Sequence, residues 1–192
     1  MARPPLEARA RATGSGATEL KRLLFAVPLL ALLGLGVLFA GYAMNRDPRV
    51  TPSALVGRPL PAVTLPALTS GAATPLAGRR EVHLINVFAS WCGPCELEHA
   101  QLMGLRDAGL PIIGIAYKDD PAQSRAFLQR LGDPYVAVLV DRDGAAGLEL
   151  GVSGVPETFL IGADGVVLDK VSGPLTAATA RRLRETAARA GR

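Results

Sequence analysis

The sequence predicts a three-layer α/β domain with a mixed central sheet, preceded by one N-terminal transmembrane helix. Short, almost continuous apolar runs alternate with helix-length segments, which is typical of strands that are covered on both faces and joined by crossover helices. The last apolar runs are instead separated by a short Gly-containing turn, which indicates an antiparallel hairpin at the edge of the sheet. A long uncharged run near the N-terminus predicts the membrane helix.

The uncharged run covers residues 23–44. At about 1.5 Å per residue, some 22 helical residues (about 33 Å) cross a hydrocarbon core of about 30 Å. Lys and Arg residues are more frequent before the run than directly after it. The positive-inside rule therefore predicts a cytoplasmic tail at residues 1–22 and export of everything that follows the anchor.

A cleaved signal peptide is the alternative, because Ala40, Gly41 and Ala43 stand at the end of the run. The run is, however, longer than the apolar core of a usual signal peptide, which favours an uncleaved anchor. The next segment, 45–56, is polar and rich in proline and is expected to be an extended linker. The globular domain is expected to occupy residues 57–192.

Hydrophobic periodicity and turn residues place the elements of this domain. The helix that begins at the cysteine motif has four apolar residues at mostly three- and four-residue spacings: Leu97, Ala100, Leu102 and Leu105. The helix expected at 122–131 has Asp120 as its N-cap residue. The expected order is an edge strand within 57–65, a turn-rich stretch at 69–78, a central strand at 82–89, a helix from the cysteine motif to 107, a buried strand at 111–117, a helix at 122–131, an interior strand at 135–140, a short helix at 145–150, a hairpin of 158–161 and 166–171, and a helix at 175–190.

The net charge of +4 does not indicate a nucleic-acid partner, because the arginines concentrate at the two ends of the chain. The middle of the sequence is close to balanced. It contains neither a known RNA- or DNA-reading motif nor a basic stripe interleaved with aromatic residues.

The chain has 2 cysteines, Cys92 and Cys95, within the motif Trp-Cys-Gly-Pro-Cys. A scaffold held by disulfides would normally show four or more cysteines spread along the chain. A structural zinc site needs about four ligands, and only His83 and His99 could join the pair. His99 is expected on the surface of the first helix, so no metal or other cofactor is predicted.

The motif is expected at the end of a buried strand and on the first turn of a helix. Unpaired N–H groups and the helix dipole at that position favour a negative charge on Cys92. In such motifs the pKa of the first thiol falls to about 3.5–7.5, which supplies a thiolate near neutral pH. Cys92 is therefore the predicted nucleophile and Cys95 the shielded resolving thiol of a thiol–disulfide exchange. Trp91 is expected to flank the docking surface for a protein substrate.

Residues 57–173 resemble the thioredoxin superfamily and, within it, the membrane-anchored DsbE/CcmG family of thiol–disulfide interchange proteins of cytochrome c maturation. Three stretches carry the resemblance: Asn86–Cys95 with the four residues that follow, Gly114–Asp120, and Gly151–Phe159. It implies a thioredoxin-like fold in which the segment 135–150 is an inserted strand and helix. The pair Gly93-Pro94, which is thioredoxin-like, leaves the redox potential open.

The resemblance also implies roles for single residues. The Val155–Pro156 bond should be cis and face the cysteines, and the backbone beside it should pair with an incoming peptide. Thioredoxins have a buried aspartate where this chain has Asn86, so another group must transfer protons. The resemblance points to Glu98 and Glu157 for this role.

The implied function is that of a reductant for disulfides in apocytochrome c, or in a helper protein of haem ligation, at the periplasmic side of the inner membrane. A membrane electron carrier would regenerate the cysteine pair. A general extracytoplasmic thiol–disulfide oxidase or reductase is an alternative within the same class. A peroxiredoxin and a copper metallochaperone using Cys92, Cys95 and His99 are alternatives from other classes.

Overall fold

The computed structural model describes residues 16–45 and 54–192. The chain divides into two compact units, residues 1–47 and 48–192. The first contains helix α1 (Gly16–Asn45). Among the described residues, no helix is long and apolar enough to cross a membrane. The transmembrane helix stays a prediction, and residues 1–15 of the predicted tail and 46–53 of the predicted linker lie outside the described residues.

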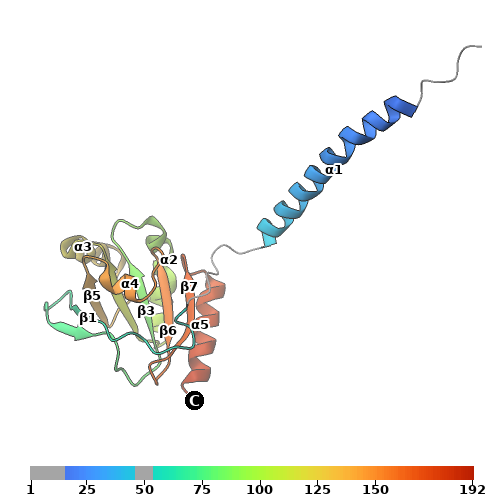
Figure 1. The fold of residues 1–192 in the computed structure, drawn as a ribbon. Coiled ribbons are helices and arrows are strands. Elements are labelled where there is room, and N and C mark those ends of the chain that lie inside the picture. The colour runs from blue at the N-terminus through green and yellow to red at the C-terminus, as the bar shows by residue number, and fades with distance from the viewer. Residues whose placement is uncertain (1–15, 46–53) are drawn as a thin grey trace, which may run out of the picture. The chain divides into compact units, whose positions relative to one another are not determined.

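The second unit is built on a mixed five-stranded sheet of order β5-β4-β3-β6-β7 (Figure 1). Its strands are β3 (His83–Phe88), β4 (Ile112–Tyr117), β5 (Ala137–Asp141), β6 (Glu157–Ile161) and β7 (Val167–Ser172). Strand β4 pairs in parallel with β3 and β5, whereas β6 is antiparallel to β3 and β7. The predicted parallel centre and antiparallel edge hairpin are therefore confirmed.

Helices α2 (Gly93–Asp107), α3 (Pro121–Leu131) and α5 (Ala177–Ala190) contribute side chains to a hydrophobic cluster on one face of the sheet. Helix α4 (Ala145–Glu149) and the segment before β3 contribute to the cluster on the other face. Every residue of the central strand β3 is buried. Because side chains alternate along a strand, Leu84, Asn86 and Phe88 lie on the α2 face, and Asn86 is the polar residue among them.

Three predicted assignments differ from the structure in part or in detail. Residues 57–60 do bond along the edge of the main sheet, where Pro59 forms an antiparallel bridge with Val166 and Gly57 N–H donates to Val167 C=O at 2.8 Å. Strand β1 (Thr64–Pro66), however, pairs with β2 (Ala73–Pro75) in a separate two-stranded sheet, and β2 lies in the stretch 69–78, which was expected to form only turns. Two prolines remove N–H donors from the segment before β1. Strand β5, expected inside the sheet, lies at its edge, where Leu68 N–H donates to Val138 C=O at 2.8 Å. The outer side of β5 is thus partly covered by the chain itself.

The buried face of α2 also differs from the prediction. Leu97 is 78% exposed and Ala100 is exposed, whereas the polar residues Glu98 and His99 are buried beside Leu102 and Leu105. The spacing of apolar residues along α2 therefore predicted the wrong buried face for this helix. Polar side chains can occupy the core when they find hydrogen-bond partners there.

Gly114 on β4 provides a test of this packing. A Cβ at this position would lie 2.9 Å from Cδ2 of Tyr135 and 3.0 Å from Cε1 of Phe88. We expect Gly114→Ala to lower the free energy of unfolding by about 1–3 kcal/mol through overpacking, measured by urea denaturation. Gly104→Ala on α2 is the matched control, because a Cβ there meets nothing within 4 Å. That variant should be more stable by about 1 kcal/mol, and equal effects of the two substitutions would contradict the prediction.

Candidate active site

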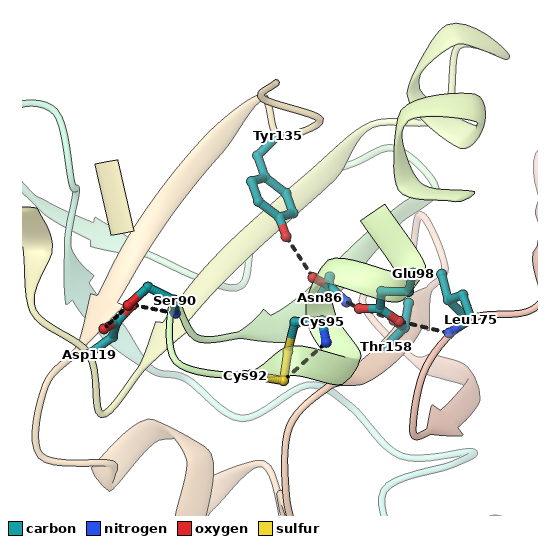
Figure 2. The surroundings of a disulfide bond; sticks show 9 residues. All are labelled: Asn86, Ser90, Cys92, Cys95, Glu98, Asp119, Tyr135, Thr158 and Leu175. Carbon is teal, nitrogen blue, oxygen red and sulfur yellow. Dashed lines mark hydrogen bonds between the residues drawn. A yellow bond between two sulfur atoms is a disulfide. The ribbon is translucent and has the colours of Figure 1, made fainter. Parts of the chain in front are cut away.

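The cysteine pair sits at the N-terminus of α2, as predicted. Cys92 is the N-cap residue, and its sulfur accepts a hydrogen bond from Cys95 N–H at 3.1 Å. The two side chains form a disulfide (Figure 2). Pro94 stands in the first turn, where its missing N–H has no intrahelical acceptor to lose. In the reduced protein, the free N–H groups of this turn would stabilise a thiolate on Cys92.

The two cysteines are buried, whereas their neighbours in the motif are exposed to solvent. Cys92 is 3% and Cys95 2% exposed in the disulfide form, so the greater accessibility expected for Cys92 is not visible in this state. Trp91 is 60% exposed, and Gly93 and Pro94 are also exposed. The buried disulfide therefore lies beneath an accessible rim that includes an aromatic ring.

A buried polar network lies behind the cysteines (Figure 2). Asn86 Nδ2 donates to Glu98 Oε1 at 2.8 Å and to Thr158 Oγ1 at 3.0 Å, and Tyr135 OH donates to Asn86 Oδ1 at 2.7 Å. The other oxygen of Glu98 accepts from Leu175 N–H at 2.8 Å. This network joins α2, β3, β6 and the segments before β5 and α5.

Glu98 occupies the centre of the network and is 0% exposed. Burial raises the pKa of Glu98 to about 7, although the hydrogen bonds from Leu175 and Asn86 favour the ionised form. A carboxyl group with this pKa can hold or release a proton near neutral pH. It stands one helical turn after Cys95, on the same helix.

Tyr135, Thr158 and Leu175 were not among the predicted site residues. The signal that could have found them is Asn86 itself, because an amide in the middle of a buried strand needs hydrogen-bond partners. Burial raises the pKa of Tyr135 well above its ordinary value, and the charge of Glu98 adds to this effect. Tyr135 therefore stays protonated and acts as a donor to Asn86.

The Val155–Pro156 peptide bond is cis, as the resemblance implied. Val87 pairs with Glu157, so Pro156 lies at the same end of the sheet as Phe88, where the chain leaves β3 for the cysteine loop. Val155 packs against both hydrophobic clusters. The structure therefore brings the proline loop and the cysteine motif to one end of the sheet.

Glu157 is placed differently from Glu98. It alternates with Thr158 along β6, which puts its side chain on the sheet face opposite Asn86 and Glu98. Its carboxylate forms an ion pair with the buried Lys170 at 2.8 Å and accepts a hydrogen bond from Ser153 Oγ at 2.6 Å. The two glutamates predicted for proton transfer are thus not brought together.

The predicted surface position of His99 is wrong. The ring is buried, lies edge-on to Phe127 at a centroid distance of 5.7 Å, and its Nε2 lies 3.0 Å from Gly132 C=O. His83 is also buried, at the end of β3 remote from Phe88, with Nδ1 2.8 Å from Glu81 C=O. Burial lowers the pKa of both histidines.

A disulfide-forming Cys-x-x-Cys pair at a helix N-terminus, a cis-proline at the same end of a mixed sheet and helices on both faces define a thioredoxin-like thiol–disulfide oxidoreductase. The Redoxin family model matches residues 55–184. The thiol:disulfide interchange protein HelX of Rhodobacter capsulatus is 42% identical over 160 residues, which cover 81% of this chain and 89% of HelX. DsbE of Allochromatium vinosum is 43% identical over 165 residues, which cover 83% and 88% of the two chains.

Solved structures show the same fold. A thiol:disulfide interchange protein from Chlorobium tepidum aligns with a TM-score of 0.56 and 24% identity over 67% of this chain and 94% of its own. A DsbF homologue from Corynebacterium diphtheriae aligns with a TM-score of 0.61 and 19% identity over 73% and 96% of the two chains. The chain belongs to the redoxin family and, within it, to the DsbE-type thiol:disulfide interchange proteins.

The raised pKa of Glu98 predicts a specific pH dependence of stability. The group ionises near 4.5 when unfolded and near 7 when folded, so only the folded state holds the proton between these values. The free energy of unfolding should therefore fall by about 3 kcal/mol as the pH rises through this window. We expect Glu98→Gln to lack this fall, measured by urea denaturation from pH 4.5 to 8.

The free energies of unfolding of wild type and variant are compared at each pH. The lowered pKa values of His83 and His99 make the free energy of unfolding rise with pH below pH 6.5 in both proteins, so this contribution cancels in the difference. Glu96→Gln is the control on the same helix. Glu96 is exposed, and its hydrogen bond from Arg130 lowers its pKa, so its contribution changes below the window. Parallel pH curves for wild type and Glu98→Gln would show that Glu98 ionises like an exposed carboxyl.

Proposed function

We propose that this oxidoreductase is a reductant outside the cytoplasm that opens disulfides in apocytochrome c or in a helper protein of haem ligation. The observation that carries the proposal is the combination of Cys92 at the helix N-cap with a buried, protonatable Glu98 one turn after Cys95. Haem attachment sites of c-type cytochromes have the pattern Cys-x-x-Cys-His, and their cysteines can form a disulfide that blocks ligation. The reducing direction is taken from the resemblance to the DsbE/CcmG family.

In the first step, the Cys92 thiolate attacks one sulfur of the substrate disulfide. A mixed disulfide forms between Cys92 and the substrate, and the other substrate sulfur leaves as a thiolate that takes a proton from water. The helix N-terminus favours this step because it stabilises the attacking thiolate.

In the second step, Cys95 must lose its proton before it attacks the Cys92 sulfur. Ionised Glu98 is the proposed acceptor of that proton, since its pKa of about 7 suits transfer in both directions near neutral pH. The Cys92–Cys95 disulfide forms, the second substrate sulfur is released, and two electrons have passed to the substrate.

Substrate docking is proposed at the rim around the disulfide. Within residues 54–192, the backbone of Val155 makes no hydrogen bond to another part of the backbone, which leaves its N–H and C=O for an extended peptide. The exposed Trp91 would contact residues beside the attacked cysteine, whereas Pro156 is buried and would act through the backbone that precedes it.

Glu157 has a different proposed role from the one implied by the resemblance. Its bonds to Ser153 and Lys170 support a structural function, in which it holds the loop that leads into Pro156. Transfer of a proton by Glu157 stays a prediction that its position on the opposite face does not favour.

Residues 23–44 are proposed to anchor the protein in the inner membrane, with 1–22 in the cytoplasm, 45–56 as linker and 57–192 in the periplasm. Side chains of α1 are described for 27–41, and the large apolar ones among them are 58–72% exposed. An exposed apolar helix is the expected form of a membrane anchor. A membrane thiol–disulfide carrier is the proposed electron donor for the oxidised pair.

Trapping tests the reaction and the substrate together. In Cys95→Ala, the second step is blocked, so full-length protein expressed in its own cells should accumulate a mixed disulfide through Cys92. We expect apocytochrome c or a haem-ligation protein in the captured adduct, identified by mass spectrometry after non-reducing electrophoresis.

Cys92→Ala is the control, because it leaves Cys95 buried without the nucleophile and should capture nothing. Addition of a small dithiol to cells that lack the gene should restore c-type cytochromes if the protein is a reductant. Capture of unrelated envelope proteins, or restoration by an oxidant instead, would contradict the proposed substrate or direction.

The anchor is tested separately. We expect the full-length protein to stay in the membrane fraction after alkaline carbonate extraction, and a variant that lacks residues 1–44 but carries a cleavable export signal to become soluble. A mature N-terminus directly after Ala43, found by mass spectrometry, would show a cleaved signal peptide instead.

A further inference from the structure

The loop that follows β4 holds the cysteine loop at two consecutive positions. Trp91 Nε1 donates to Lys118 C=O at 3.2 Å, and Ser90 N–H donates to Asp119 Oδ2 at 2.7 Å. Lys118 has a φ of +48°, the left-handed conformation that non-glycine residues rarely adopt. Lys118 and Asp119 belong to the stretch Gly114–Asp120, which the proposed mechanism does not use.

The Asp119 carboxylate binds four donors. Oδ2 accepts from Ser90 N–H and from Ser124 Oγ, each at 2.7 Å, whereas Oδ1 accepts from Ser90 Oγ at 2.7 Å and from Asp120 N–H at 2.9 Å. Asp119 itself is buried, at 5% exposure. One carboxylate therefore ties the cysteine loop to the β4–α3 loop and to α3 (Figure 2 shows Ser90 and Asp119).

These contacts argue against a role for Asp119 in proton transfer. A carboxylate offers about four lone-pair positions, and all of them have a donor here. A carboxylate that accepts hydrogen bonds at all of these positions holds the donating segments in place. Two of its four bonds go to Ser90, two residues before the nucleophile Cys92.

The held loop forms one wall of a cavity beside the cysteines. The cavity has a volume of about 580 Å³, and its lining includes Trp91, Lys118 and Phe127. Because Trp91 is anchored at its ring nitrogen and still 60% exposed, the position of its ring depends on the loop that Asp119 holds. A displacement of the loop would change both the cavity wall and the aromatic rim.

We propose that Asp119 is a positioning residue that holds Ser90 and Trp91 in the arrangement that receives a protein disulfide at Cys92. The inference rests on the proposed reduction of protein disulfides at this site. It places the effect of Asp119 on substrate recognition and not on thiol chemistry, since the carboxylate acts through Ser90 and Trp91.

The test compares variants of the full-length protein in detergent, with a peptide that contains an oxidised Cys-x-x-Cys-His segment as the substrate and a dithiol as the reductant that regenerates the cysteine pair. Asp119→Asn removes one acceptor at unchanged size, and Ser90→Ala removes one hydroxyl donor on the cysteine loop. We expect each to raise KM by about tenfold with a much smaller change in kcat, because a misplaced docking surface weakens binding. Ser124→Ala, which removes a donor to the same carboxylate from α3, is the matched control and should change KM far less.

The fluorescence of the protein gives an independent readout, because Trp91 is the single tryptophan of the chain. We expect its steady-state anisotropy to fall in Asp119→Asn and Ser90→Ala and to stay at the wild-type value in Ser124→Ala. Unchanged KM and anisotropy in both loop variants, with only a lower melting temperature, would overturn the proposal. An equal loss of kcat would overturn it too.

The two proposals fail separately. If the wild type does not reduce the peptide, the proposed substrate is wrong. The anisotropy then still decides whether Asp119 fixes Trp91: a fall confined to the loop variants supports the positioning role, and no fall overturns it.

Discussion

The Asn86 carboxamide is the group on which the arrangement of the site depends. It is fully buried in the central strand, so its nitrogen and its oxygen must both find hydrogen-bond partners within the protein. Glu98 from α2, Thr158 from β6 and Tyr135 from the segment before β5 provide them. Three elements that are distant in sequence are thereby brought to one point directly behind the cysteines, and a shift of any of them would leave a buried polar group unpaired.

The two buried glutamates show how neighbours decide what a carboxyl group can do. Glu98 has hydrogen bonds from neutral donors and no cation among the groups that shift its pKa, so burial keeps it protonated up to about pH 7. Glu157 is equally buried but is paired with Lys170. The ion pair and the hydrogen bond from Ser153 Oγ hold its side chain in place. The same residue type is therefore a buried carboxyl with a raised pKa on one face of the sheet and a member of a buried ion pair on the other.

Much of this fold could be predicted from the sequence, because its central features depend on local patterns. The nearly continuous apolar run of β3, the cysteines at the start of α2 and the hairpin of β6 and β7 are all visible within a few residues. The burial of Glu98 and His99 could not be predicted in this way. Glu98 accepts hydrogen bonds from Asn86 and Leu175, which are 12 and 77 residues away, and His99 contacts Gly132, which is 33 residues away. No periodicity within the helix reports such contacts. The edge position of β5 likewise depends on which strands pair.

The cysteine loop is held from two sides, although the disulfide within it is nearly buried. On one side Cys92 is fixed as the N-cap of α2, and on the other Ser90 and Trp91 are fixed by the loop after β4. The exposed surface between them consists of Trp91, Gly93 and Pro94. In the proposed docking, a partner contacts this rim as its sulfur approaches Cys92. Because a preformed rim does not have to be ordered on binding, the proposed docking of a partner at this rim would cost little conformational entropy.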